Sequence, residues 1–143
     1  MASRSSTDLI VIHCAATKPS MDIGRNEIDA WHRHRGFLGI GYHWVVRRNG
    51  ELEVGRDEEV AGAHARGFNH NSVSIALVGG VTEGDVSVAE DNFTDEQWIS
   101  LEQLVKGLMH KYPDADVVGH ADLEGVNKKC PSFDVKSWLK KQL

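Results

Sequence analysis

The chain has 143 residues, of which 41% are hydrophobic and 26% are charged, so it is long enough for one domain with its own core. Its net charge of −5 argues against nonspecific binding to nucleic acid, because phosphate binding needs a basic face. No stretch reaches the roughly 18 apolar residues of a membrane span, and the N-terminus lacks the apolar segment of a secretory signal. We therefore expect a monomeric protein made in the cytoplasm, without membrane insertion and without a nucleic-acid partner.

The first half of the chain predicts three strands and one helix. Residues 8–13 contain four successive apolar residues followed by a His and predict a buried strand. Residues 26–35 have apolar side chains at helical spacing and are followed by a glycine, which is typical of a helix end. Residues 41–48 and 51–55 predict two further strands. The dipeptide Asn49-Gly50 between them favours a hairpin, because both residue types tolerate positive φ.

The second half predicts two more strands and two more helices. Residues 72–78 predict a buried strand, and the segment Thr94-Asp95-Glu96-Gln97 is a capping box that begins a long amphipathic helix. A short strand over residues 116–119 and a terminal helix over residues 134–143 follow. Strands that alternate with helices predict a single α/β domain with a mixed central β-sheet flanked by about three helices. We assign residues 8–143 to this domain and residues 1–7 to a flexible N-terminal segment.

Two histidines and a cysteine form a candidate metal site. His13 and His120 each follow a predicted strand, and Cys130 lies on the loop after His120. If the two strands are neighbours, both imidazoles emerge at one sheet edge, and Cys130 can fold back to meet them. Two imidazoles and a thiolate suit Zn²⁺, and three protein ligands plus water form a catalytic rather than a structural zinc site. The alternative is that each strand-end His merely caps the sheet edge.

The other cysteine and several other histidines leave alternatives open. Cys14 is adjacent to His13 and should point to the opposite face, although a disulfide with Cys130 would remove that thiolate as a ligand. His64 and His70 lie on a long predicted loop, where they could line a cleft or simply be solvated.

Several segments in register resemble the zinc-dependent N-acetylmuramoyl-L-alanine amidases, the family that includes the peptidoglycan recognition proteins and the short phage lysozymes. The resemblance covers nearly the whole chain from residue 8 onward. The segments that carry it are Ile12-His13-Cys14-Ala15-Ala16-Thr17, Trp31-His32-Arg33-His34-Arg35-Gly36-Phe37, Gly41-Tyr42-His43-Trp44, Gly67-Phe68-Asn69-His70-Asn71-Ser72 and Lys128-Lys129-Cys130-Pro131-Ser132-Phe133-Asp134.

The resemblance implies one zinc ion held by His13, His120 and Cys130, with Tyr42 and Lys128 as assisting catalytic groups. It makes residues 8–143 a zinc amidase catalytic domain. A Lys128 ammonium can lie beside the developing oxyanion, where loss of one such donor typically costs ~10²–10³ in rate. Tyr42 can hydrogen-bond the attacking water and move a proton. The segment between His120 and Cys130 is longer than is usual in the family, and no carboxylate stands out as the general base.

The implied substrate is the amide between N-acetylmuramic acid and L-alanine in bacterial peptidoglycan. The favoured hypothesis is a phage endolysin that is made in the host cytoplasm and reaches the cell wall with the help of a separate protein. One alternative is a peptidoglycan-binding module without catalysis, although non-catalytic members of the family lose the cysteine ligand. Another is additional regulatory binding to an RNA polymerase, which is a second role in the phage branch.

Overall fold

The computed structural model describes residues 1–126 and 129–142 and contains a five-stranded mixed sheet with three α-helices. In chain order the elements are β1 (Leu9–Cys14), α1 (Arg25–His34), β2 (Trp44–Val46), β3 (Leu52–Val54), β4 (Ser72–Leu77), α2 (Asp95–Lys111), β5 (Asp116–Gly119) and α3 (Val135–Gln142), with short 3₁₀ turns at Asn69–Asn71 and His120–Asp122.

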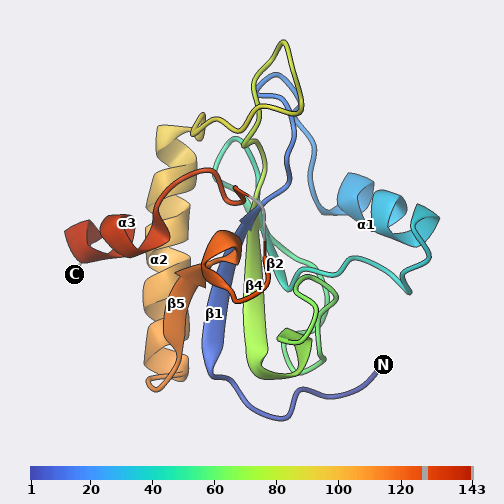
Figure 1. Cartoon of the computed structure of the whole chain (residues 1–143), viewed down its shortest axis with the longest axis vertical. Coiled ribbons are helices and arrows are strands. Elements are labelled where there is room, and N and C mark those ends of the chain that lie inside the picture. The colour runs from blue at the N-terminus through green and yellow to red at the C-terminus, as the bar shows by residue number, and fades with distance from the viewer. Residues whose placement is uncertain (127–128, 143) are drawn as a thin grey trace.

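The strands are arranged in the order β3-β2-β4-β1-β5. The pairs β2–β4, β4–β1 and β1–β5 are parallel, and only the β2–β3 hairpin is antiparallel. Helices α2 and α3 lie on one side of the sheet and α1 lies on the other (Figure 1). The predicted α/β class, with a mixed central sheet and three flanking helices, is confirmed. Among the described residues, no helix is long and apolar enough to cross a membrane.

The two faces of the central strands have different chemistry. Along β4, Val73, Ile75 and Leu77 point into the main hydrophobic cluster, which also contains buried residues of α2. Because side chains alternate along a strand, Ser72 and Ser74 point to the opposite face, and both are fully buried. Buried hydroxyls need hydrogen-bond partners, so this second face is a place where polar side chains from loops can dock.

The β2–β3 hairpin closes through a longer loop than the Asn49-Gly50 pair alone. The Gly50 amide donates to the Arg47 carbonyl at 2.8 Å, and the Arg47 amide donates to the Glu51 carbonyl at 2.9 Å. Gly50 has a φ of +86°, whereas Asn49 is not among the residues with positive φ. The hairpin therefore has a three-residue loop with glycine at the left-handed position, rather than a two-residue turn.

The predicted capping box at the start of α2 is confirmed. Thr94 Oγ1 accepts the Gln97 amide at 3.1 Å, and Gln97 Oε1 accepts the Thr94 amide at 3.0 Å. The Gln97 side chain is fully buried and reaches the sheet, where its amide donates to the carbonyls of Val46 and Val78. One residue thus caps the helix and joins it to the ends of β2 and β4.

The N-terminal segment runs along the loop that precedes β4. The Arg4 amide donates to the Glu59 carbonyl, and the Ser5 amide donates to the His70 carbonyl, both at 2.9 Å. The flexibility expected for residues 1–7 concerns motion and stays a prediction.

Candidate metal centre

The parallel pairing of β1 with β5 brings two of the predicted ligands together. Ile12 lies opposite Gly119, so the next residue after each, His13 and His120, lie side by side at the carboxyl edge of the two strands. Their ring centroids are 4.4 Å apart, and both side chains are buried. The two strands are therefore neighbours, which the sequence analysis had to assume.

Cys130 completes the cluster. Its Sγ lies 3.9 Å from His13 Nδ1, and one potential ligand atom from each of His13, His120 and Cys130 lies within 4.8 Å of the other two. Cys14 and Cys130 are not joined by a disulfide, so the Cys130 sulfur stays in the cluster.

The donor set and its spacing fit a zinc ion. Two neutral imidazoles and a thiolate are borderline-soft ligands of the kind that zinc prefers over magnesium or calcium. A tetrahedral ion with Zn–N near 2.0 Å and Zn–S near 2.3 Å requires donor atoms roughly 3.5 Å apart. The spacing seen here is within a small side-chain adjustment of that value.

Backbone contacts hold the cysteine loop against the sheet. The Cys14 amide donates to Cys130 Sγ at 3.1 Å, and the Ala121 amide donates to the Cys130 carbonyl at 2.9 Å. Asp122 Oδ2 accepts the Gly119 amide at 2.8 Å and so caps the 3₁₀ turn that carries His120. An N–H directed at a sulfur stabilises the thiolate form over the thiol.

The structure places Tyr42 beside the cluster. Its ring centroid lies 5.1 Å from that of His13. Burial raises the pKa of the phenol, and the nearby thiols Cys130 and Cys14 raise it further, so Tyr42 is a protonated hydrogen-bond donor at neutral pH. Lys128, the other predicted assisting group, lies outside the described residues.

His64 is part of this site, which the sequence left undecided. Its Nδ1 lies 2.8 Å from His13 Nε2, and its Nε2 lies 2.9 Å from Ser72 Oγ. Burial lowers the pKa of His64 to about 3, with smaller contributions from neighbouring cationic groups, so the imidazole is neutral. His70 is exposed and is not part of the His13/His120/Cys130 cluster.

The sequence left this role open because nothing near residue 64 indicates which strand its loop docks on. The signal that was present is the spacing of Ser72 and Ser74, which places two hydroxyls on one buried face. Each accommodates a histidine from elsewhere in the chain: His64 contacts Ser72, and His43 contacts Ser74 at 3.1 Å. His43 is held at its other nitrogen by the Val60 carbonyl and does not enter the metal cluster.

A pocket of about 410 Å³ opens beside Cys130. Most of its wall is formed by small side chains, and Lys129 contributes a cation. The lining residues are Cys14, Ala16, Gly80, Val81, Ser87, Ala89, Lys129, Cys130 and Ser132.

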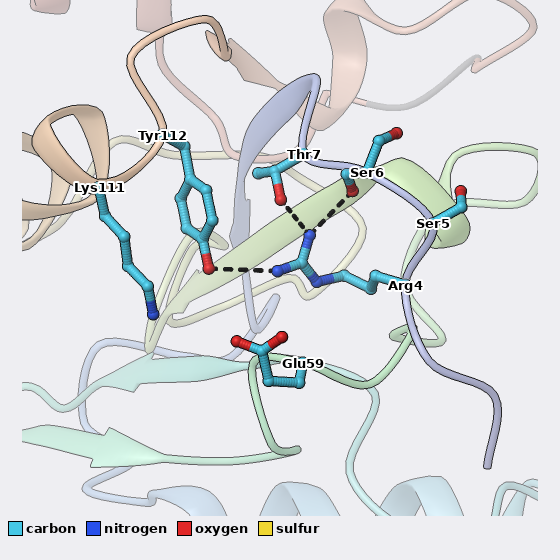
Figure 2. Close-up of a pocket in the computed structure, with 7 residues that line it drawn as sticks. All are labelled: Arg4, Ser5, Ser6, Thr7, Glu59, Lys111 and Tyr112. Carbon is cyan, nitrogen blue, oxygen red and sulfur yellow. Dashed lines mark hydrogen bonds between the residues drawn. The ribbon is translucent and has the colours of Figure 1, made fainter.

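A second pocket lies beside the N-terminal segment and does not include the candidate metal ligands (Figure 2). Its Arg4 guanidinium donates to the Tyr112 hydroxyl at 3.2 Å and to the Ser6 carbonyl at 2.9 Å. Arg4 therefore links the N-terminal segment to Tyr112, the residue that follows α2. The lining residues are Arg4, Ser5, Ser6, Thr7, Glu59, Lys111 and Tyr112.

A mixed β-sheet that carries two buried histidines and a partly buried cysteine at the carboxyl edge of two parallel strands defines a small single-domain α/β protein with a candidate hydrolytic metal centre. Residues 3–133 match the family described as N-acetylmuramoyl-L-alanine amidase. The chain belongs to this family, as its sequence motifs predicted.

Individual relatives agree with that assignment. The chain is 46% identical to the endolysin of Escherichia phage T7 over 138 residues, which span 96% of this chain and 89% of the relative. The amidase LysC from Clostridium intestinale superposes with a TM-score of 0.80 at 30% identity, over 95% of this chain and 85% of that one. The endolysin of the Thermus scotoductus bacteriophage Ph2119 gives a TM-score of 0.79 at 26% identity, over 99% and 88% of the two chains.

Proposed function

We propose that this protein is a zinc-dependent N-acetylmuramoyl-L-alanine amidase that acts as a phage endolysin. The observation that carries the proposal is the convergence of His13, His120 and Cys130 at one sheet edge, in a chain that belongs to the amidase family. The substrate is the amide that joins the lactyl group of N-acetylmuramic acid to L-alanine in peptidoglycan.

Each group near the cluster has a chemical role in amide hydrolysis. Bound zinc supplies a water activated at neutral pH and a Lewis acid for the scissile carbonyl. Tyr42 lies partly buried beside His13 and keeps its proton, so it donates a hydrogen bond to the oxygen that gains charge as the amide is attacked. Lys128 is assigned the second oxyanion contact from its position in the family motif.

The pocket beside Cys130 adjoins one of the three proposed ligands, and we propose that it receives part of the substrate. It is lined by Cys130 itself, and its largely apolar wall can exclude water from the reacting amide. Lys129 is exposed at this pocket and can pair with a carboxylate of the stem peptide.

The cellular role follows from the phage relatives. An endolysin is made in the host cytoplasm and must cross the membrane to meet its substrate, so we propose that a separate protein opens that route. The net charge of −5 favours a peptidoglycan substrate over a nucleic-acid partner.

Activity is tested on purified cell-wall sacculi with zinc added. The expected product is a soluble stem peptide with a free N-terminal L-alanine, detected by end-group labelling and mass spectrometry. Absence of that product would refute the enzymatic proposal, and sedimentation with sacculi without cleavage would favour a peptidoglycan-binding module.

Metal content is tested with two matched cysteine variants. Cys130→Ser is expected to lose stoichiometric zinc because a thiolate ligand is removed. Cys14→Ala removes the other thiol, which lies in the hydrophobic core and hydrogen-bonds Cys130 but is not one of the proposed ligands, and the variant is expected to retain zinc. Full zinc occupancy in Cys130→Ser, measured by elemental analysis, would exclude Cys130 as a ligand.

A further inference from the structure

A chain of four polar groups leads from the loop before β4 to the candidate metal centre. Ser72 Oγ donates to the Phe68 carbonyl at 2.7 Å. His64 Nε2 lies 2.9 Å from the same Oγ, and His64 Nδ1 lies 2.8 Å from His13 Nε2. Every link is within ordinary hydrogen-bond distance, so the direction of each bond can be worked out from one end.

The carbonyl at the start of the chain sets all the directions. A carbonyl oxygen only accepts, and a hydroxyl has one proton, so Ser72 uses its proton on Phe68. The Nε2 of His64 must then donate to Ser72. A neutral imidazole carries one N–H, so His64 Nδ1 accepts, and the donor to it is His13 Nε2–H.

We propose that His64 is a positioning residue that fixes His13 in the tautomer with its proton on Nε2 and thereby presents the Nδ1 lone pair to the metal. The proposal rests on the zinc site of the proposed function. Its geometric support is the direction of the His13 ring: Nδ1 is the atom 3.9 Å from Cys130 Sγ, while Nε2 faces away, toward His64. A metal-binding imidazole donates its other N–H to a neighbouring group, and that hydrogen bond generally affects metal affinity.

Neighbouring residues fix the position of the His64 imidazole. Asn69 Oδ1 accepts the amides of both His64 and Ala65, at 2.9 and 3.0 Å, which fixes the loop that carries the ring. Ser72 is fully buried in β4, beside the strand that carries His13. The ring is therefore fixed from the backbone side and from the sheet side.

The first test measures the tautomers directly and requires no variant. In protein labelled with ¹⁵N at histidine, two-bond ¹H–¹⁵N correlations distinguish an imidazole protonated on Nε2 from one protonated on Nδ1. In the zinc-loaded protein, we expect both His13 and His64 to carry the proton on Nε2. A proton on Nδ1 of His13 would overturn the proposal.

The second test uses two substitutions of His64. His64→Leu replaces the imidazole by an apolar side chain of similar bulk and removes the acceptor, so zinc affinity is expected to fall about 10–100-fold. His64→Asn can place an amide oxygen near the position of Nδ1, and we expect it to recover most of that loss. His70→Leu changes an exposed histidine of the same loop and is the control, with unchanged affinity expected.

Zinc affinity is measured by competition with a chromophoric chelator. Equal affinity in His64→Leu and wild type would overturn the proposal, as would equal losses in His64→Leu and His64→Asn. In the zinc-free protein, His64→Leu is expected to shift His13 toward a mixture of tautomers. These readouts do not depend on amidase activity, so an inactive wild-type protein would refute the proposed function and still leave the role of His64 decided.

Discussion

Replacement of Gln97 by methionine tests how much one buried polar side chain contributes to the stability of this fold. Methionine has a similar volume and a similar helix propensity, so the substitution changes hydrogen bonding more than packing. The Gln97 side chain makes four hydrogen bonds: it donates to Val46 and Val78 and accepts from Thr94 and Arg48.

The hydrogen-bond partners of Gln97 are not equally affected by its replacement. The Val46 carbonyl still accepts the Val78 amide at 3.0 Å, and the Val78 carbonyl still accepts Arg48 Nη1 at 3.2 Å. The Thr94 amide loses the acceptor that Gln97 provides. Four bonds at about 1 kcal/mol each, less about 1 kcal/mol for the additional apolar burial, predict a loss of ~3 kcal/mol.

Urea denaturation and thermal melting of the two proteins measure this difference. For a domain of this size, ~3 kcal/mol corresponds to a fall in Tm of roughly 6–12 °C. Gln103→Met is the control, because Gln103 is exposed on the same helix and its substitution should change stability by less than about 0.5 kcal/mol. A loss below about 1 kcal/mol in Gln97→Met, with a transition that stays cooperative, would refute the reasoning about the buried hydrogen bonds.

Two further predictions concern stability elsewhere in the fold. Desolvation of Glu58 opposes its ionisation, but hydrogen bonds from neighbouring side chains outweigh it and lower the pKa below the ordinary 4.5. A lowered carboxyl pKa stabilises the fold above the unfolded-state value and loses that effect as pH falls through the folded-state value. Glu58→Gln should therefore destabilise the protein at pH 7 in urea titrations, and the difference should shrink below the ordinary carboxyl pKa; a pH-independent difference would contradict this. Gly41→Ala should lose at least ~2 kcal/mol, because a Cβ there would lie 2.0 Å from the Ala63 carbonyl oxygen. Gly107→Ala, with no atom within 4 Å of the added Cβ, should gain about 0.5–1 kcal/mol in the same assay, and an equal effect of both substitutions would count against the steric reasoning.

Much of the local structure was predictable because its causes are local. The α2 cap needs only a threonine and a glutamine three residues apart, and β5 was placed at its observed bounds. The hairpin was also predicted, but its loop has three residues because Gly50 alone takes the left-handed conformation. Such differences depend on how the strands twist against each other, which a dipeptide does not encode.

The candidate site also has a part that the sequence predicted and a part that it left open. The types of its residues, and their positions at predicted strand ends, indicated His13, His120 and Cys130 as possible zinc ligands. The part played by His64 was left open, because its contact with Ser72 forms only when the loop docks on β4 and because the direction of the hydrogen bonds depends on the Phe68 carbonyl. No feature of the sequence near residue 64 indicates which strand the loop docks on.

The sequence by itself determined the chemistry available to this protein and the local elements that carry it: periodicity, caps and the family motifs act over a few residues at a time. Only the tertiary structure decided that β1 and β5 are neighbours, since parallel pairing joins residues more than a hundred positions apart. That pairing brings His13 beside His120, and the adjacent β4 brings Ser72 and, through it, His64. The sequence alone indicates the possible ligands, whereas their convergence and the orientation of the His13 ring result from the packing of the strands and loops.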